Sequence, residues 1–440
     1  MKIRGALVIA VLAVAVVMPA QAKTVGTLTA ANRLVTWSDS VDTGFINPLL
    51  VASPVPELRC LQPGACDTFT VDVALGATFW KTNGTGAVEF AIRWAYDGII
   101  DLDLQVLDAA GNKIAQSAAV DSNAESVFIP NATDGVYTVK VIPSNTFSPG
   151  SSATEVPYDA LAQVEILASD PPGEGHPMIP NLRPAPPDGF HIASAANLLP
   201  IPENKFLSCY PEETIQNPGN PTRCLRFNQT IANVGEGPMV MRFGLAGIVT
   251  PSMDDNIIVQ RIFSTDGSYQ DVTVPEHYVF HEVHGHLHYQ GFGQTILYNW
   301  SQSSGRGTIA SVGHKVGFCM IDVQMQPEYW GKTGNGPRAH TFPFDCVLPD
   351  EVDPTGPQAW VEQGVQVGWA DVYGWNLADQ YVDITNVKDG VYELVQIANP
   401  NNSVIESTAA DNCTSTVIRI KGDKVTTPVG PGSAVPCPAY

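Results

Sequence analysis

The residues best placed to do chemistry form the stretch HEVHGHLHYQ at positions 281–290, which holds four of the nine histidines of the chain. If residues 282–289 form one β-strand, alternate side chains point to opposite faces, and His284, His286 and His288 share a face. In a helix, successive members of this triplet would be about 200° apart and could not converge on one ion. The pattern therefore predicts a strand that carries three imidazole ligands.

Three imidazoles on one strand face suit a metal ion. Their Cα atoms would be about 6.6 Å apart, and imidazole arms span that distance to reach a metal at about 2.0 Å. Three protein ligands leave a coordination position open, as a catalytic metal requires, whereas a fortuitous histidine run would crowd like donors together. Imidazole binds copper, zinc, iron and nickel, so the triplet leaves the ion undetermined. By the same alternation His281 faces away, and we expect a structural role for it.

The overall composition limits the class of protein. A chain of 440 residues exceeds the size at which single cores stop growing, which favours two domains. With 38 Gly, 35 Pro and only 15% charged residues, turns and short strands are expected in place of long surface helices. The formal net charge of −21 excludes a nucleic-acid binder and would attract cations such as amines or metals.

The N-terminal 22 residues predict a cleaved export signal. A charged start, MKIR, precedes an apolar run from Ala6 to Met18 and small residues that end at Ala22. The run is too short to span a bilayer comfortably, and no later stretch of about 18 apolar residues appears. We therefore expect a secreted protein, outside the cell or on the exterior of its envelope, with no membrane span.

Eight cysteines in an exported chain predict disulfides. Their spacing favours pairs that close modest loops: Cys60 with Cys66, Cys209 with Cys224, Cys319 with Cys346, and Cys413 with Cys437.

Short alternating runs predict an all-β fold made mostly of short antiparallel strands. In residues 23–170 such runs recur, with Tyr137, Val139 and Val141 on one face, as in a small β-sandwich. A Pro- and Gly-rich stretch near residue 170 ends this unit, and residues 171–440 again alternate short strands with irregular loops. The predicted organisation is thus a signal (1–22), an accessory β-sandwich (23–170) and a catalytic domain (171–440). The stretch from Asp101 to Pro143 resembles bacterial pre-peptidase C-terminal domains, which are accessory sandwiches of secreted enzymes.

Several separated motifs after the triplet resemble those of lysyl oxidases. They are GHKVGFC at 313–319, DVYGWNLADQYVDITNV from Asp371, and ESTAADN from Glu406, in the order of that family. The resemblance covers about residues 178–440 and implies copper(II) bound by His284, His286 and His288. It also implies lysine tyrosylquinone, a cofactor made from the protein itself, formed from Lys315 in the GHK element and Tyr373 in the Asp-x-Tyr-Gly element.

The resemblance implies oxidative deamination of primary amines, lysyl side chains of proteins among them. The quinone is a carbonyl electrophile that captures the amine, a base removes the α-proton, and aldehyde is released. Dioxygen then restores the quinone, with ammonia and hydrogen peroxide as products. Asp371, two residues before Tyr373, is the predicted base. The family also suggests a calcium site, which maps onto Asn181, the Leu182 carbonyl, Glu406, Asp411 and Asn412; such oxygens suit a hard cation.

Three other functions stay open at the level of sequence. A zinc or iron enzyme could use the same triplet with water as the nucleophile. A non-catalytic copper-binding or adhesive protein could keep the triplet without the quinone. The third is an inactive relic of the family.

Overall fold

The structure is a computed structural model of the whole chain. It describes residues 22–42, 60, 66–84, 86–95, 101–117, 123–144, 155–166, 170–194, 199–200, 206–207, 209, 221–246, 257–276, 278–281, 286–313, 317–332, 351–352, 358–377, 380–428 and 433–434. Apart from the helix α2 (Phe79–Asn83) and the 3-10 turn η4 (Pro327–Tyr329), the regular elements in these ranges are strands. The all-β prediction is confirmed.

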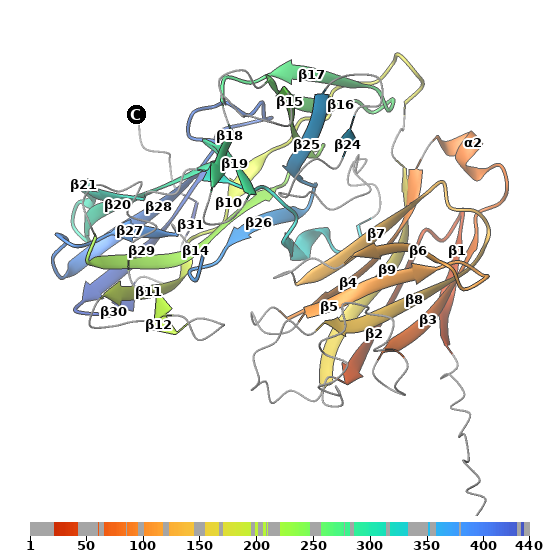
Figure 1. Ribbon diagram of the computed structural model, residues 1–440, viewed down its shortest axis with the longest axis horizontal. Helices are drawn as coiled ribbons and strands as arrows, with labels where there is room; N and C mark the ends of the chain where they lie inside the picture. The colour runs from red at the N-terminus through yellow and green to blue at the C-terminus, as the bar shows by residue number, and fades with distance from the viewer. Residues whose placement is uncertain are drawn as a thin grey trace, which may run out of the picture.

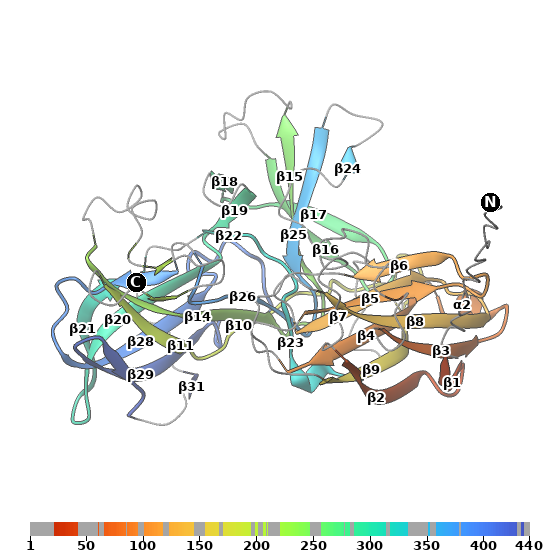
Figure 2. The ribbon, with the colours of Figure 1, turned by 60° about the horizontal axis from the view of Figure 1, so that its bottom comes forward.

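The first nine strands form two sheets that face each other as a sandwich (Figures 1 and 2). One sheet has the order β1-β3-β8-β5-β6 and the other β2-β9-β4-β7. The strands are β1 (Lys23–Thr29), β2 (Leu34–Asp42), β3 (Asp67–Ala74), β4 (Gly86–Trp94), β5 (Asp101–Leu107), β6 (Lys113–Ser117), β7 (Ala124–Pro130), β8 (Gly135–Ser144) and β9 (Glu155–Ile166).

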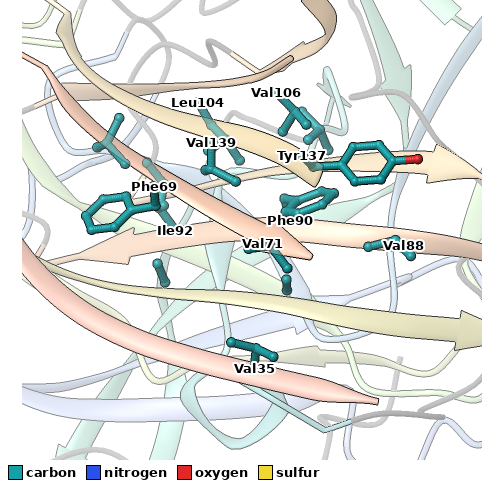
Figure 3. Packing of buried hydrophobic residues seen from close by; sticks show 14 of the residues in the cluster. Val35, Phe69, Val71, Val88, Phe90, Ile92, Leu104, Val106, Tyr137 and Val139 are labelled. Carbon is teal, nitrogen blue, oxygen red and sulfur yellow. The ribbon is translucent and has the colours of Figure 1, made fainter. Parts of the chain in front are cut away.

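The sandwich core follows the alternation of the sequence. Tyr137, Val139 and Val141 of β8 are all buried in one cluster, as their shared strand face predicts. Figure 3 shows the Tyr137 ring beside Phe90 of β4, and the two ring centroids are 5.8 Å apart. Because β4 and β8 belong to different sheets, this contact joins the two layers.

The remaining strands build the C-terminal part of the chain. Their sheets have the orders β10-β14-β26-β23, with β11 and β27 also on β14; β17-β16-β15-β25-β24; β18-β19-β22; β21-β20-β28-β29-β30, with β31 on β29; and β12-β13. The strands are β10 (Leu182–Pro184), β11 (Asp188–Ser194), β12 (Leu199–Pro200), β13 (Phe206–Leu207), β14 (Arg223–Asn233), β15 (Met239–Ala246), β16 (Ile257–Phe263), β17 (Tyr269–Thr273), β18 (Tyr278–His281), β19 (His286–Gln290), β20 (Gly293–Ser301), β21 (Gly305–Val312), β22 (Gly317–Phe318), β23 (Gln324–Met325), β24 (Glu351–Val352), β25 (Gln358–Val365), β26 (Trp369–Tyr373), β27 (Tyr381–Asp383), β28 (Gly390–Ala398), β29 (Cys413–Lys421), β30 (Lys424–Thr426) and β31 (Ser433–Ala434).

The long strand β14 is the backbone element that positions the candidate site. Its C-terminal half pairs with β26, Gln229 opposite Tyr373, and its N-terminal half pairs with β27, Cys224 opposite Asp383. Figure 1 shows β26 running beside β14. The loop between β26 and β27 therefore starts and ends on the same strand, which fixes the two ends of the segment that follows Tyr373.

Two of the predicted disulfides are confirmed, Cys60–Cys66 and Cys209–Cys224. Cys319 and Cys413 are each disulfide-bonded as well, and their expected partners, Cys346 and Cys437, lie outside the described residues. The predicted signal also lies outside them except for Ala22. None of the helices in the described ranges has the length and apolar character to cross a membrane.

Candidate active site

The histidine-rich stretch belongs to a hairpin, and the expected single strand over residues 282–289 is wrong. Strand β18 pairs antiparallel with β19, with His281 opposite His286 and Val279 opposite His288, so the chain reverses between His281 and His286. In the sequence the alternation of histidines with other residues runs from His284 to His288 without a break, so it could not locate the turn. The expectation that His281 faces away from the triplet assumed one continuous strand, so it no longer has a basis.

His288 is the member of the triplet whose side chain the structure describes. It lies on β19 between Leu287 and Tyr289, which belong to the apolar core, and it is itself only 3% exposed. His284 and the side chain of His286 lie outside the described residues. Within the described part of the chain, no group of three or more His, Cys, Asp or Glu side chains is arranged to hold a metal. The copper site thus stays a prediction, with one predicted ligand in a buried position.

Tyr373 ends β26 and is buried against the strand next to the histidines. Its hydroxyl accepts a hydrogen bond from the Cys319 N–H at 2.8 Å and lies 3.2 Å from the Cys319 carbonyl, to which it can donate. Its ring packs edge-on against Phe318, with centroids 4.8 Å apart and an interplanar angle of 87°. These contacts fix both the position of the phenol oxygen and the plane of the ring.

Strand β22 connects this phenol to the histidine strand. Phe318 of β22 pairs with Tyr289 of β19, the residue directly after His288. Cys319, the residue directly after β22, contacts the phenol oxygen, so β22 connects Tyr373 with β19. The proximity of Tyr373 to the predicted copper ligands stays a prediction.

Lys315 lies outside the described residues, so its pairing with Tyr373 stays a prediction. Described residues resume at Gly317 and Phe318, which form β22. Phe318 contacts the Tyr373 ring, and the Cys319 backbone contacts the Tyr373 hydroxyl, although 54 residues separate Cys319 from Tyr373.

Asp371 lies two residues before Tyr373 on β26, and alternation places both on one face. Its side chain is only 2% exposed. Burial raises the pKa of Tyr373 well above its ordinary value, and the charge of Asp371 raises it further, while the hydrogen bond from the Cys319 N–H lowers it. The phenol is therefore held neutral, and the Asp371 carboxylate is near enough to influence it.

Comparison with known proteins relates two regions of the chain to protein families. Residues 354–428, which include Asp371, Tyr373 and Glu406, match the family described as lysyl oxidase. In this region the chain is similar to lysyl oxidases. The match does not reach the histidine triplet or Lys315. Residues 66–143 match the family described as bacterial pre-peptidase C-terminal domain, in the sandwich.

The individual relatives that the chain resembles are distant. Lysyl oxidase homolog 3 of Homo sapiens is 28% identical over 148 residues, which are 34% of this chain and 16% of the relative. Lysyl oxidase homolog 3B of Danio rerio is 29% identical over 148 residues, 34% and 15% of the two chains. The chain thus spans less than a fifth of the length of these relatives. The crystal structure of the pre-peptidase C-terminal domain of collagenase from Bacillus anthracis aligns at 15% identity and a TM-score of 0.21, over 34% of this chain and 98% of that one.

The residues predicted to bind calcium lie together where the start of the lysyl oxidase-like part meets its end. Asn181 Nδ2 donates to Asp411 at 3.1 Å, and the Leu182 N–H donates to Glu406 at 3.1 Å. Asn412 Nδ2 donates to the other Glu406 oxygen at 2.6 Å. Three buried oxygens remain without a hydrogen-bond partner, the Oδ1 atoms of Asn181, Asp411 and Asn412. Buried oxygens are normally satisfied, so this set fits a hard cation.

The electrostatics of this cluster favour a cation as well. Burial raises the pKa of Glu406, and the nearby Asp411 raises it further. Hydrogen bonds from Asn399, Asn412 and the Leu182 N–H oppose the shift without cancelling it. The carboxyl groups of Glu406 and Asp411 therefore lie in one cluster with the unpaired amide oxygens of Asn181 and Asn412, and ionised Glu406 is disfavoured there unless positive charge is added.

We expect calcium to stabilise the protein through this cluster. With copper-free protein, calcium at about a hundredfold excess over its dissociation constant should raise the melting temperature by about 5–10 °C. Asp411→Asn should remove most of this shift, whereas Asp423→Asn, a change at a 40% exposed carboxylate of the same domain, should keep it. The measurement is thermal unfolding with a calcium chelator and with added calcium. A wild-type melting temperature that does not change when calcium is added would contradict a calcium site at this cluster.

Sequence reasoning missed the residues that fix the loop after Tyr373. Arg226, fully buried on β14, donates from Nη1 to the carbonyls of Trp375 at 3.1 Å and Leu377 at 2.9 Å. Asn228, two residues along β14, accepts the Trp375 N–H at 2.9 Å. The signal was present in the run LRFNQT, where the spacing of Arg226 and Asn228 puts both side chains on one face of a strand.

Proposed function

We propose that the protein is a secreted copper-dependent amine oxidase. It oxidises primary amines, lysyl side chains of proteins among them, to aldehydes and releases ammonia and hydrogen peroxide. The observation that carries the proposal is the place of Tyr373, buried with its hydroxyl on Cys319 beside the strand that pairs with β19. In this proposal residues 1–22 are a cleaved signal, 23–170 the accessory sandwich and 171–440 the catalytic domain.

Copper would be held by His284, His286 and His288, and with dioxygen it supplies the oxidising equivalents that convert a phenol to a quinone. The protein's own residues supply the positioning of the phenol and the amine that joins it. Two contacts with the Cys319 backbone hold the phenol oxygen, and the edge of Phe318 holds the ring plane. The ε-amine of Lys315 would add to the oxidised ring, and oxidation of this reduced adduct by a further dioxygen molecule would yield lysine tyrosylquinone. The buried surroundings exclude water from the ring.

Asp371 serves as the base that removes the α-proton of the bound amine. It is buried, on the Tyr373 face of β26, and close enough to raise the pKa of the phenol. Asp371→Asn should keep the quinone stain and lower kcat for amine oxidation about 10²–10⁴-fold. Asp322→Asn is the matched control, because Asp322 is also buried but accepts a backbone hydrogen bond from Gln366. If Asp371→Asn keeps the wild-type kcat, normalised to its quinone content, then another group must be the base.

The decisive experiment is loading with copper in air, followed by tryptic mass spectrometry. The proposal expects one cross-linked species that joins the Lys315 and Tyr373 peptides, a redox-cycling quinone stain, and hydrogen peroxide on addition of a primary alkylamine. Copper bound with unlinked peptides would indicate a copper-binding or adhesive protein without catalysis. Retention of zinc or iron, with no peroxide from amines, would instead indicate a metal-activated water at the triplet.

A further inference from the structure

The outer face of the sheet β2-β9-β4-β7 contacts the lysyl oxidase-like part of the chain. On β4, Ile92 and Trp94 point into the sandwich core, so Arg93 points to the outer face. Its guanidinium lies 4.6 Å from the centre of the Trp330 ring, and Asp159 of β9 holds it by bonds of 3.2 and 3.1 Å. The cyan η4 turn, which precedes Trp330, lies next to the orange sandwich strands in both views (Figures 1 and 2).

The apolar core around Tyr373 extends across this contact. Ala124 of β7 pairs with Arg93 and is 1% exposed. It belongs to the same buried cluster as Tyr373, and Trp330 packs against that cluster. A sandwich residue is thus part of the core that surrounds the proposed quinone precursor.

The Pro- and Gly-rich stretch at the predicted domain boundary is hydrogen-bonded to the C-terminal part of the chain. The Asp170 N–H donates to the Thr265 carbonyl at 3.0 Å, and the Thr265 N–H donates to the His176 carbonyl at 3.0 Å. The Met178 N–H donates to the Phe263 carbonyl at 2.8 Å. Domains that are joined only by a flexible linker move relative to each other by default. The backbone hydrogen bonds of Asp170, His176 and Met178 restrict such motion here.

From Trp330 the contact leads to the strand that carries Tyr373. Tyr329 packs so closely on Gly368 that a Cβ there would come within 2.6 Å of its side chain. The Gln326 N–H donates to the Gly368 carbonyl at 2.8 Å, and Met325 pairs with Trp369, the first residue of β26. The segment of residues 325–330 therefore fixes the start of β26, four residues before Tyr373.

We propose that the sandwich is a positioning part of the catalytic unit. Through Arg93 on Trp330 it holds residues 325–330 and the start of β26, so that Tyr373 keeps its place for quinone formation. The docking follows from the contacts alone, whereas its effect on the quinone rests on the proposed function. Arg93 is a positioning residue and touches no reacting group.

Hydrogen exchange of the full-length, copper-free protein tests the docking. Arg93→Ala and Trp330→Ala should each speed exchange in peptides covering 324–332 and 366–373 about tenfold, the scale of one partly buried cation–π contact. Arg93→Lys and Trp330→Phe, which keep the charge and the ring, should stay near wild type. Arg33→Ala is the matched control, because it removes a cation–π contact with Phe79 inside the sandwich, at 5.2 Å. Unchanged exchange in Arg93→Ala, or an equal rise in Arg33→Ala, would overturn the docking.

The rate of quinone formation after copper addition tests the positioning. Arg93→Ala should slow staining about tenfold with kcat per quinone unchanged, and Arg93→Lys should restore the rate. If wild type forms the quinone and Arg93→Ala forms it equally fast, the positioning role is overturned. If wild type forms no quinone while exchange changes as expected, the proposed function fails and the docking stands.

Discussion

Tyr373→Phe is expected to abolish both quinone staining and amine oxidation in copper-loaded protein. Phenylalanine lacks the oxygen that becomes a quinone carbonyl, so the activity should fall to the uncatalysed background, a loss of about 10⁶-fold or more. The structural effect is much smaller. The Cys319 N–H loses its acceptor, which costs about 1–3 kcal/mol, and the ring keeps its packing against Phe318. Staining, peroxide release and thermal unfolding measure these outcomes separately.

Tyr392→Phe is the matched control for this experiment. Tyr392 is also buried in the lysyl oxidase-like part, and its hydroxyl donates to the Lys388 carbonyl at 2.7 Å. It lies in a different apolar cluster from Tyr373. Its loss should leave staining and peroxide release unchanged. Amine oxidation that survives in Tyr373→Phe would remove this phenol from the mechanism.

Local patterns of the sequence were sufficient to predict the all-β fold class. Tyr137, Val139 and Val141 alternate with polar residues, and each is buried in the sandwich core. The same alternation rule gave a wrong prediction for the histidine stretch. It predicted one strand, whereas β18 and β19 pair antiparallel across a chain reversal that alternation does not reveal. A period of two residues describes each strand separately and carries no information on which strand pairs with which.

The arrangement of the candidate site could be predicted only in part, because it depends on contacts between distant parts of the chain. That Asp371 and Tyr373 share a face follows from their spacing on one strand. That the Tyr373 hydroxyl meets Cys319 does not, because this contact depends on how β22 and β26 are placed in different sheets. The cluster of Asn181 with Glu406 and Asp411 came from family resemblance, since no local pattern links residues so far apart. The contact of Arg93 with Trp330 had no sequence signal for the same reason.

His288→Ala is expected to remove copper and, with it, the quinone. If His288 is one of three ligands, its loss should weaken copper binding by more than about 100-fold. Mutation of residues that only orient the ligands already lowers metal affinity about 10- to 100-fold. The variant should then retain less than one tenth of the wild-type copper after dialysis, and give no stain. Elemental analysis and staining measure the two effects on the same sample.

The matched control for the histidine is His191→Ala. His191 is half-buried in the same part of the chain, and its ring lies 4.2 Å from that of Trp375, in the loop after Tyr373. Its loss should leave the copper content at the wild-type value. Thermal unfolding must show that both variants fold, since removing the buried His288 ring leaves a cavity. A folded His288→Ala protein with a full equivalent of copper would place the metal elsewhere, and the proximity of β19 to Tyr373 would then no longer explain how the phenol is oxidised.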